Sequence, residues 1–97
     1  MHGMIVKVTA VSGQRQSLIS ILLTGTGEMS GCLSYIVAKD FLDENAIWIT
    51  EIWDSKASHD ASLSLPSVKG AIAKAKPLIA VFGTPVVTTP VQSAQNH

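Results

Sequence analysis

The sequence predicts an α+β fold with the element order βαββαβ, in which the second helix is broken in two. Four segments of alternating or β-branched residues predict the strands, and apolar residues at three-to-four-residue spacing between them predict the helices. Connection rules then favour one four-stranded antiparallel sheet with both helices on one face. A third observation, a strand that is apolar on both sides, predicts that this sheet meets a partner.

The first strand is expected at Met4–Val11, where β-branched residues alternate with others. A helix should follow from Gln14 to about Met29, because apolar residues recur there at helical spacing. Two glycines, Gly25 and Gly27, weaken the last turns of this helix and predict that it frays or ends early.

A hairpin of two strands is expected next, at Cys32–Lys39 and Ala46–Trp53, joined by a polar loop. The second of these strands is the most β-prone segment of the chain. Alternation places on one side Ile47, Ile49, Glu51 and Trp53, and on the other side Trp48, Thr50 and Ile52. Because both sides are largely apolar, we expect homodimerisation through the open sheet face.

The second helix is expected in two pieces. Ser55 is placed as the N-cap of a short helix that runs to about Ser64. Pro66 then suits the first position of a second stretch, expected to reach about Val81, with Pro77 as a kink or its last turn. A final strand is expected over 86–91, and a frayed end over 92–97.

Composition limits the classes of function. With 97 residues, the chain is expected to be a single domain with its core at about 4–91. Seven acidic and seven basic residues give no net charge, so we expect neither nucleic-acid nor membrane partners. The start of the chain lacks the pattern of a signal peptide, and Cys32 is the single cysteine, which together favour a cytoplasmic protein.

A small set of residues could carry chemistry. The three histidines, His2, His59 and His97, lack the spacing of metal ligands, so no metal site is expected. A carboxylate between apolar neighbours, Glu51, is costly unless it is paired or performs a function. A structural and a functional role both stay open for Glu51. Tyr35 and Trp53 could likewise serve only in core or interface packing.

Three short motifs in order resemble one family. The segments Gly31–Tyr35 (GCLSY), Glu51–Trp53 (EIW) and Leu63–Lys69 (LSLPSVK) are similar to elements of the antibiotic biosynthesis monooxygenase-like, or quinol monooxygenase-like, family. The resemblance spans nearly the whole chain, from Met4 to Val91. It implies a ferredoxin-like domain that forms a homodimeric α/β barrel. It also implies a monooxygenase that oxidises a small aromatic, polyphenol or quinol with molecular oxygen, without metal, flavin or another cofactor.

The resemblance also suggests roles for residues. The expected catalytic residues are Glu51, Trp53 and Tyr35. Trp53 would supply an aromatic wall or an indole N–H donor, and Tyr35 and Glu51 would be hydrogen-bonding groups if their side chains reach the same cavity. The expected substrate-binding residues are Trp53, Ser62, His59 and Ile72. As a lone helix histidine, His59 is expected to be solvated or to lie in the N-terminal turn of its helix, rather than to act as a base.

Two positions depart from the family pattern: the family often has histidines where this chain has Ser62 and Ser67. A noncatalytic dimeric ligand-binding module therefore stays open as an alternative. So does an isomerase of a small carbonyl compound, for which proton abstraction by Glu51 would suffice. A haem-binding branch is disfavoured, because the helix after Pro66 offers no axial histidine.

Overall fold

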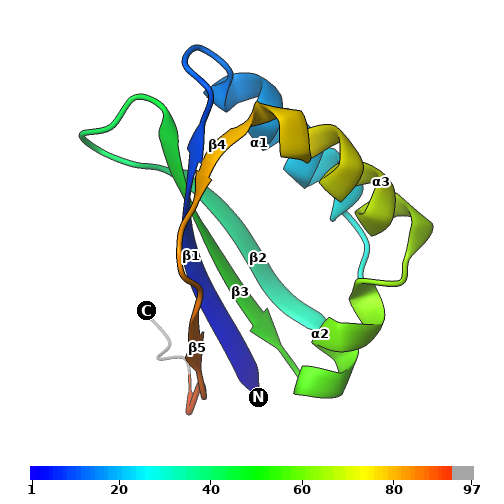
Figure 1. Cartoon of the computed structure of the whole chain (residues 1–97). Coiled ribbons are helices and arrows are strands. Elements are labelled where there is room, and N and C mark those ends of the chain that lie inside the picture. Colours follow the sequence, from blue (N-terminus) through cyan, green and yellow to red (C-terminus); the bar gives the residue numbers. More distant parts are fainter. Residues whose placement is uncertain (93–97) are drawn as a thin grey trace, which may run out of the picture.

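A computed structural model of the chain describes residues 1–92. The end expected to fray, 92–97, lies outside the described residues except for Gln92. The elements are β1 (His2–Ala10), α1 (Arg15–Gly25), β2 (Cys32–Lys39), β3 (Ala46–Trp53), α2 (Lys56–Ser62), α3 (Pro66–Ala75), a 3₁₀ turn η1 (Lys76–Leu78), β4 (Ile79–Phe82) and β5 (Val86–Thr88). Figure 1 shows that the helices cover one face of the sheet and leave the other open. The α+β fold with helices on one face is confirmed.

The sheet is antiparallel with the strand order β2-β3-β1-β4, and β5 also pairs with β1. β4 pairs with the end of β1, at Val8–Ala10, whereas β5 pairs with its beginning, at Gly3–Ile5. The fourth position of the expected sheet is therefore filled by two short strands in succession (Figure 1). The Gly83 amide still donates to the Lys7 carbonyl of β1 at 2.8 Å, and strand pairing is then interrupted at Thr84-Pro85, where the proline has no N–H to offer a strand.

The expected course of the second helix to Val81 is wrong. α3 ends at Ala75, and Ile79–Phe82 forms β4 instead. Pro77 lies in the 3₁₀ turn between them and supplies no amide hydrogen to continue an α-helix. The β-prone residues that follow gain hydrogen bonds by pairing with β1, an alternative that local periodicity does not reveal. The last strand is also shorter than expected, since it ends at Thr88, shortly before Pro90.

Local signals place the other helix ends well. α1 ends at Gly25, the first of the two glycines, and the Thr26 hydroxyl closes the last turn by donating to the Leu22 carbonyl at 2.6 Å. The Ser55 hydroxyl accepts from the Ser58 amide at 3.1 Å, which confirms the expected N-cap of α2. Pro66 occupies the first turn of α3 as expected.

The core lies between the helices and the inner face of the sheet. It is formed chiefly by the buried residues Val6, Val8, Ala10, Leu18, Ile47, Ile49 and Ala75. The strand alternation brings Glu51 and Trp53 to this same inner face, at the end of the sheet that α2 covers. In residues 1–92, no helix has both the length and the apolar character to cross a membrane.

Candidate functional site

Strand pairing gathers the polar residues of the inner face. Tyr35 on β2 and Met4 on β1 lie opposite Glu51 on β3, one on each side of it. Cys32 lies opposite Trp53 at the end of the same strand pair. Glu51 is therefore in the middle of the sheet, with its side chain directed toward the helix layer.

The Glu51 carboxylate is buried, with 8% of the residue exposed, and Trp53 holds it in place. The Trp53 indole Nε1–H donates to Glu51 Oε1 at 3.1 Å, a contact that alternate residues of one strand can make because they share a face. In residues 1–92, no fully buried side-chain nitrogen or oxygen lacks a hydrogen-bond partner. The second carboxylate oxygen, Oε2, has no hydrogen bond within that range, so it retains accessible surface for a ligand.

A cavity of about 180 Å³ lies above Glu51, between the sheet and the helices. Its polar lining groups come from four different elements or loops: Thr26, Tyr35, Glu51, His59 and Ser62. The remainder of the lining is apolar and includes Ile72 of α3 and Phe82 of β4. One carboxylate and a few hydroxyls in an otherwise apolar hollow suit a small, largely apolar ligand with one or two polar atoms.

His59 lies differently from the solvated position expected of it. Its side chain is 16% exposed and lines the cavity. The ring meets Trp53 edge to face with centroids 5.4 Å apart, and its centroid also lies 5.4 Å from that of the His2 ring. Its Nδ1 is 3.5 Å from Asp60 Oδ1. The second helix therefore contributes an aromatic wall that also packs against the residue holding Glu51.

Two other expected site residues have restricted roles. Trp53 is fully buried and does not line the cavity, so it acts on a ligand only through Glu51. Ser62 lines the cavity, but its hydroxyl donates to the His59 carbonyl at 2.6 Å, which leaves it as an acceptor. Ile72 supplies an apolar surface. The structure thus brings Glu51, Tyr35, His59, Ser62 and Ile72 to one cavity and places Trp53 directly behind it.

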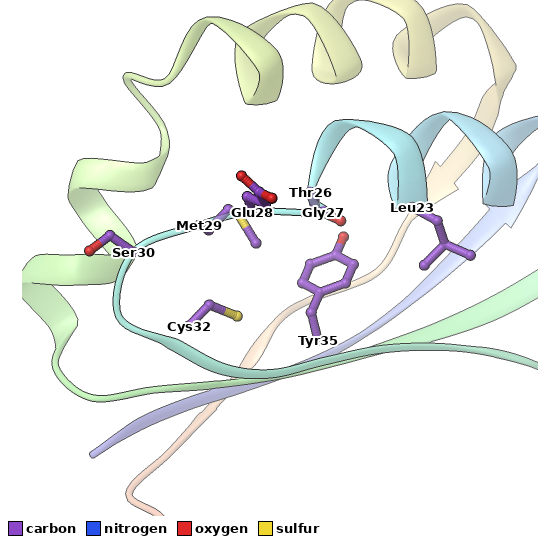
Figure 2. Close-up of a pocket in the computed structure, with 8 residues that line it drawn as sticks. All are labelled: Leu23, Thr26, Gly27, Glu28, Met29, Ser30, Cys32 and Tyr35. Atoms are coloured by element: carbon purple, nitrogen blue, oxygen red, sulfur yellow. The ribbon is translucent and has the colours of Figure 1, made fainter.

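A wider, more open hollow of about 760 Å³ adjoins this cavity. Figure 2 shows it between the end of α1, the following loop and the beginning of β2, with the Tyr35 ring rising from the strand toward Thr26. Thr26, Met29 and Tyr35 border both spaces, so the wider hollow is the approach to the cavity from this side. Sequence reasoning missed Thr26 and Met29, for which the only signal was the glycine pair that ends α1.

Burial determines the protonation state of two groups in this region. Desolvation, with a further contribution from the Glu51 charge, raises the pKa of Tyr35 to about 12, although hydrogen bonding with Thr26 partly opposes the shift. Desolvation likewise raises the pKa of the Cys32 thiol. At neutral pH, Tyr35 is therefore a phenol that can donate a hydrogen bond, and Cys32 is a thiol rather than a nucleophilic thiolate. Across residues 1–92, no three His, Cys, Asp or Glu side chains gather to hold a metal ion.

Comparison with known proteins supplies the family. The family model described as antibiotic biosynthesis monooxygenase matches residues 1–74, about three quarters of the chain. The chain belongs to this family. The match extends from β1 into the last turn of α3 and hence includes every side chain of the polar lining. No curated protein matches the chain.

Solved structures agree with this membership. A candidate antibiotic biosynthesis monooxygenase from Chloroflexus aurantiacus is 54% identical over 97% of this chain and 96% of its own, with a TM-score of 0.94. A second candidate, from Deinococcus radiodurans, is 24% identical over 100% of this chain and 99% of its own, with a TM-score of 0.80. At that lower identity the likeness shows the fold alone. The resemblance drawn from the three motifs is therefore confirmed.

Proposed function

We propose that this protein is a cofactor-independent monooxygenase that oxidises a small phenolic or hydroquinone substrate with molecular oxygen. Membership of the family supports the reaction class. The observation that carries the proposal is the buried Glu51 carboxylate at an apolar cavity. Trp53 orients it, and its second oxygen has no hydrogen bond to residues 1–92. A positioned carboxylate in such surroundings is suited to accept a proton from a bound hydroxyl group.

The reaction needs no electron source other than the substrate. Glu51 accepts the proton of a ring hydroxyl, and the resulting anion passes one electron to oxygen, giving superoxide and a substrate radical. These combine at a ring carbon, the O–O bond then breaks, and that carbon loses its hydrogen as a proton. One oxygen atom stays on the ring as a new carbonyl, and the other leaves as water with protons including the one that Glu51 held.

Neighbouring residues assist by binding and orienting the substrate. Tyr35, protonated at neutral pH, donates a hydrogen bond to the developing oxyanion opposite the carboxylate. His59 and Ile72 form walls against the ring. The apolar lining excludes water, which strengthens the electrostatic interactions inside.

Oxygen uptake by metal-stripped protein tests this proposal. The substrates are substituted hydroquinones, catechols and anthrones, and the variant is Glu51→Gln, which keeps the shape but cannot accept a proton. We expect the variant to lower kcat by about 10²- to 10⁴-fold, the usual contribution of a general base. Glu28→Gln is the matched control, since Glu28 lies in the wider hollow outside the cavity. Uptake that is equal in wild type and Glu51→Gln would contradict the role of Glu51.

A noncatalytic ligand-binding module is the second candidate. It is favoured by Ser62, which replaces a frequent histidine and uses its hydroxyl hydrogen within its own helix. Ligand binding without any oxygen uptake across the substrate panel would support this candidate over the monooxygenase.

We further propose that two copies associate through the open sheet face, giving the dimeric α/β barrel. Support comes from the large apolar side chains exposed there, Ile36, Trp48, Val81 and Val86, which are between 39% and 58% exposed. A cytoplasmic site of action accords with the single cysteine, which forms no disulfide within the chain.

A further inference from the structure

A second, larger space between α3 and β4 adjoins the Glu51 cavity. This space, which we call the apolar chamber, has a volume of about 420 Å³. Four residues border both it and the Glu51 cavity: Leu22, Ile49, Ile72 and Phe82. Because the two spaces share these walls, a ligand bound at Glu51 can extend into the chamber.

The volume at Glu51 limits the part of a ligand that binds there. A cavity of about 150 Å³ is known to hold one benzene molecule, so about 180 Å³ accommodates a single substituted ring. Pockets for drug-sized ligands have volumes of roughly 300 Å³ or more. A three-ring substrate would therefore have to place most of its framework outside this cavity, either in the chamber or in the wider hollow.

The chemistry of the chamber decides what can lie there. The residues that line it without touching the Glu51 cavity are Val8, Ala75, Ile79 and Lys76. Lys76 is the single polar side chain of the lining, and it is exposed at the surface. A hydroxyl or carbonyl group inside the chamber would lose its hydrogen bonds with water without gaining a partner, whereas an aliphatic group would only gain by burial.

We propose that the substrate is a monocyclic hydroquinone or phenol with an aliphatic side chain, the ring lying at Glu51 and the side chain in the apolar chamber. This inference rests on the proposed function, because it names the substrate of the same site. The chamber residues Ala75 and Ile79 then determine the length of side chain that is accepted. Ala75 comes from the end of α3 and Ile79 from the beginning of β4.

Anaerobic calorimetry measures the binding of a hydroquinone series with methyl, butyl and octyl substituents, separately from turnover. For wild type we expect affinity to rise by about fourfold for each buried CH₂, until the chamber is full. Ala75→Leu should remove most of the gain of butyl over methyl and leave the affinity for methylhydroquinone unchanged. Ala73→Leu, the same change at an exposed position of α3, is the control and should behave as wild type.

Ala75→Leu makes the chamber smaller, whereas Ile79→Ala makes it larger. The second variant therefore tests the inference even if Ala75→Leu does not fold. By enlarging the chamber it should increase the gain of octyl over butyl. An affinity that is independent of chain length in wild type and in Ile79→Ala would overturn the inference, as would tighter binding of anthrone than of every alkylhydroquinone.

The same series distinguishes the inference from the proposed function. Chain-length-dependent binding without oxygen uptake would support the chamber and contradict the monooxygenase. Uptake with methylhydroquinone, together with binding that ignores chain length, would contradict the chamber and support the monooxygenase.

Discussion

At the scale of single residues, the chemistry depends on how Glu51 and Trp53 are arranged along one strand. Residues two apart on a strand share a face, so an indole donor and a carboxylate acceptor can meet without help from another element. The fully buried ring of Trp53 makes this donor rigid, and His59 packs against its edge. A carboxylate held in this way is oriented before a substrate binds, which reduces the entropic cost of reaction.

Tyr35 provides a residue-scale prediction that can be measured cleanly, because it is the single tyrosine of the sequence. Its pKa is raised to about 12, so its phenolate absorbance should appear near pH 12 rather than near pH 10. The neutral phenol is favoured in the folded state, so this contribution to stability is complete below about pH 10 and is lost as pH rises through about 12. Ultraviolet difference titration of the folded protein measures the transition. A midpoint near pH 10 would show that the ring is solvated.

At the scale of elements, the two long helices approach each other closely at one glycine. Gly25 lies in the last turn of α1, and a Cβ atom placed on it would overlap the Ala71 side chain of α3. Gly70 immediately precedes Ala71 on α3, yet a Cβ atom placed on Gly70 would meet nothing within 4 Å. The approach at Gly25 sets how the helix layer lies over the sheet, and it thereby sets the depth of the cavity.

The two glycines form a matched pair for a stability measurement. Gly70→Ala should raise the free energy of unfolding by about 0.5–1 kcal/mol, because alanine restricts the unfolded chain and nothing obstructs its methyl group. Gly25→Ala should instead lower it by about 1–3 kcal/mol, since the helices must separate. Chemical denaturation of both variants measures the difference. Equal stabilisation by the two substitutions would mean that α1 and α3 are not in close contact.

At the scale of the whole molecule, the sheet has two apolar faces but only one layer of helices (Figure 1). The open face also has a fixed side chain, Trp48, near the loop that joins β2 and β3. Trp48 Nε1–H donates to Asp40 Oδ1 at 2.8 Å, and Lys7 Nζ lies 5.9 Å from the centre of the indole ring. An apolar surface that is already ordered loses little side-chain entropy when a partner covers it.

Dimerisation through this face predicts a concentration-dependent stability. Ile36→Lys places a charge at an apolar position of the open face and should convert the protein into a monomer with a lower Tm. Leu23→Lys is the control, because Leu23 is similarly exposed but lies on α1 in the helix layer. Sedimentation equilibrium of the three proteins measures the assembly. A wild type that stays monomeric at high concentration would contradict the proposed interface.

The sequence by itself predicted the features that depend on neighbours along the chain. The strands of the hairpin have the expected bounds, and Ser55 and Pro66 begin their helices where expected. Periodicity, capping and the three motifs sufficed for the fold class and the family, because each is read within a few residues. The alternation of β3 also placed Glu51 and Trp53 on one face.

Only the tertiary structure decided what depends on distant partners. The end of α3 and the existence of β4 followed from pairing with β1, some seventy residues away along the chain. The position of His59 against Trp53 and the apolar chamber arise where separate elements meet. Sequence spacing reports which side of an element a residue occupies, but the shape and volume of a cavity are set by how closely the packed layers approach.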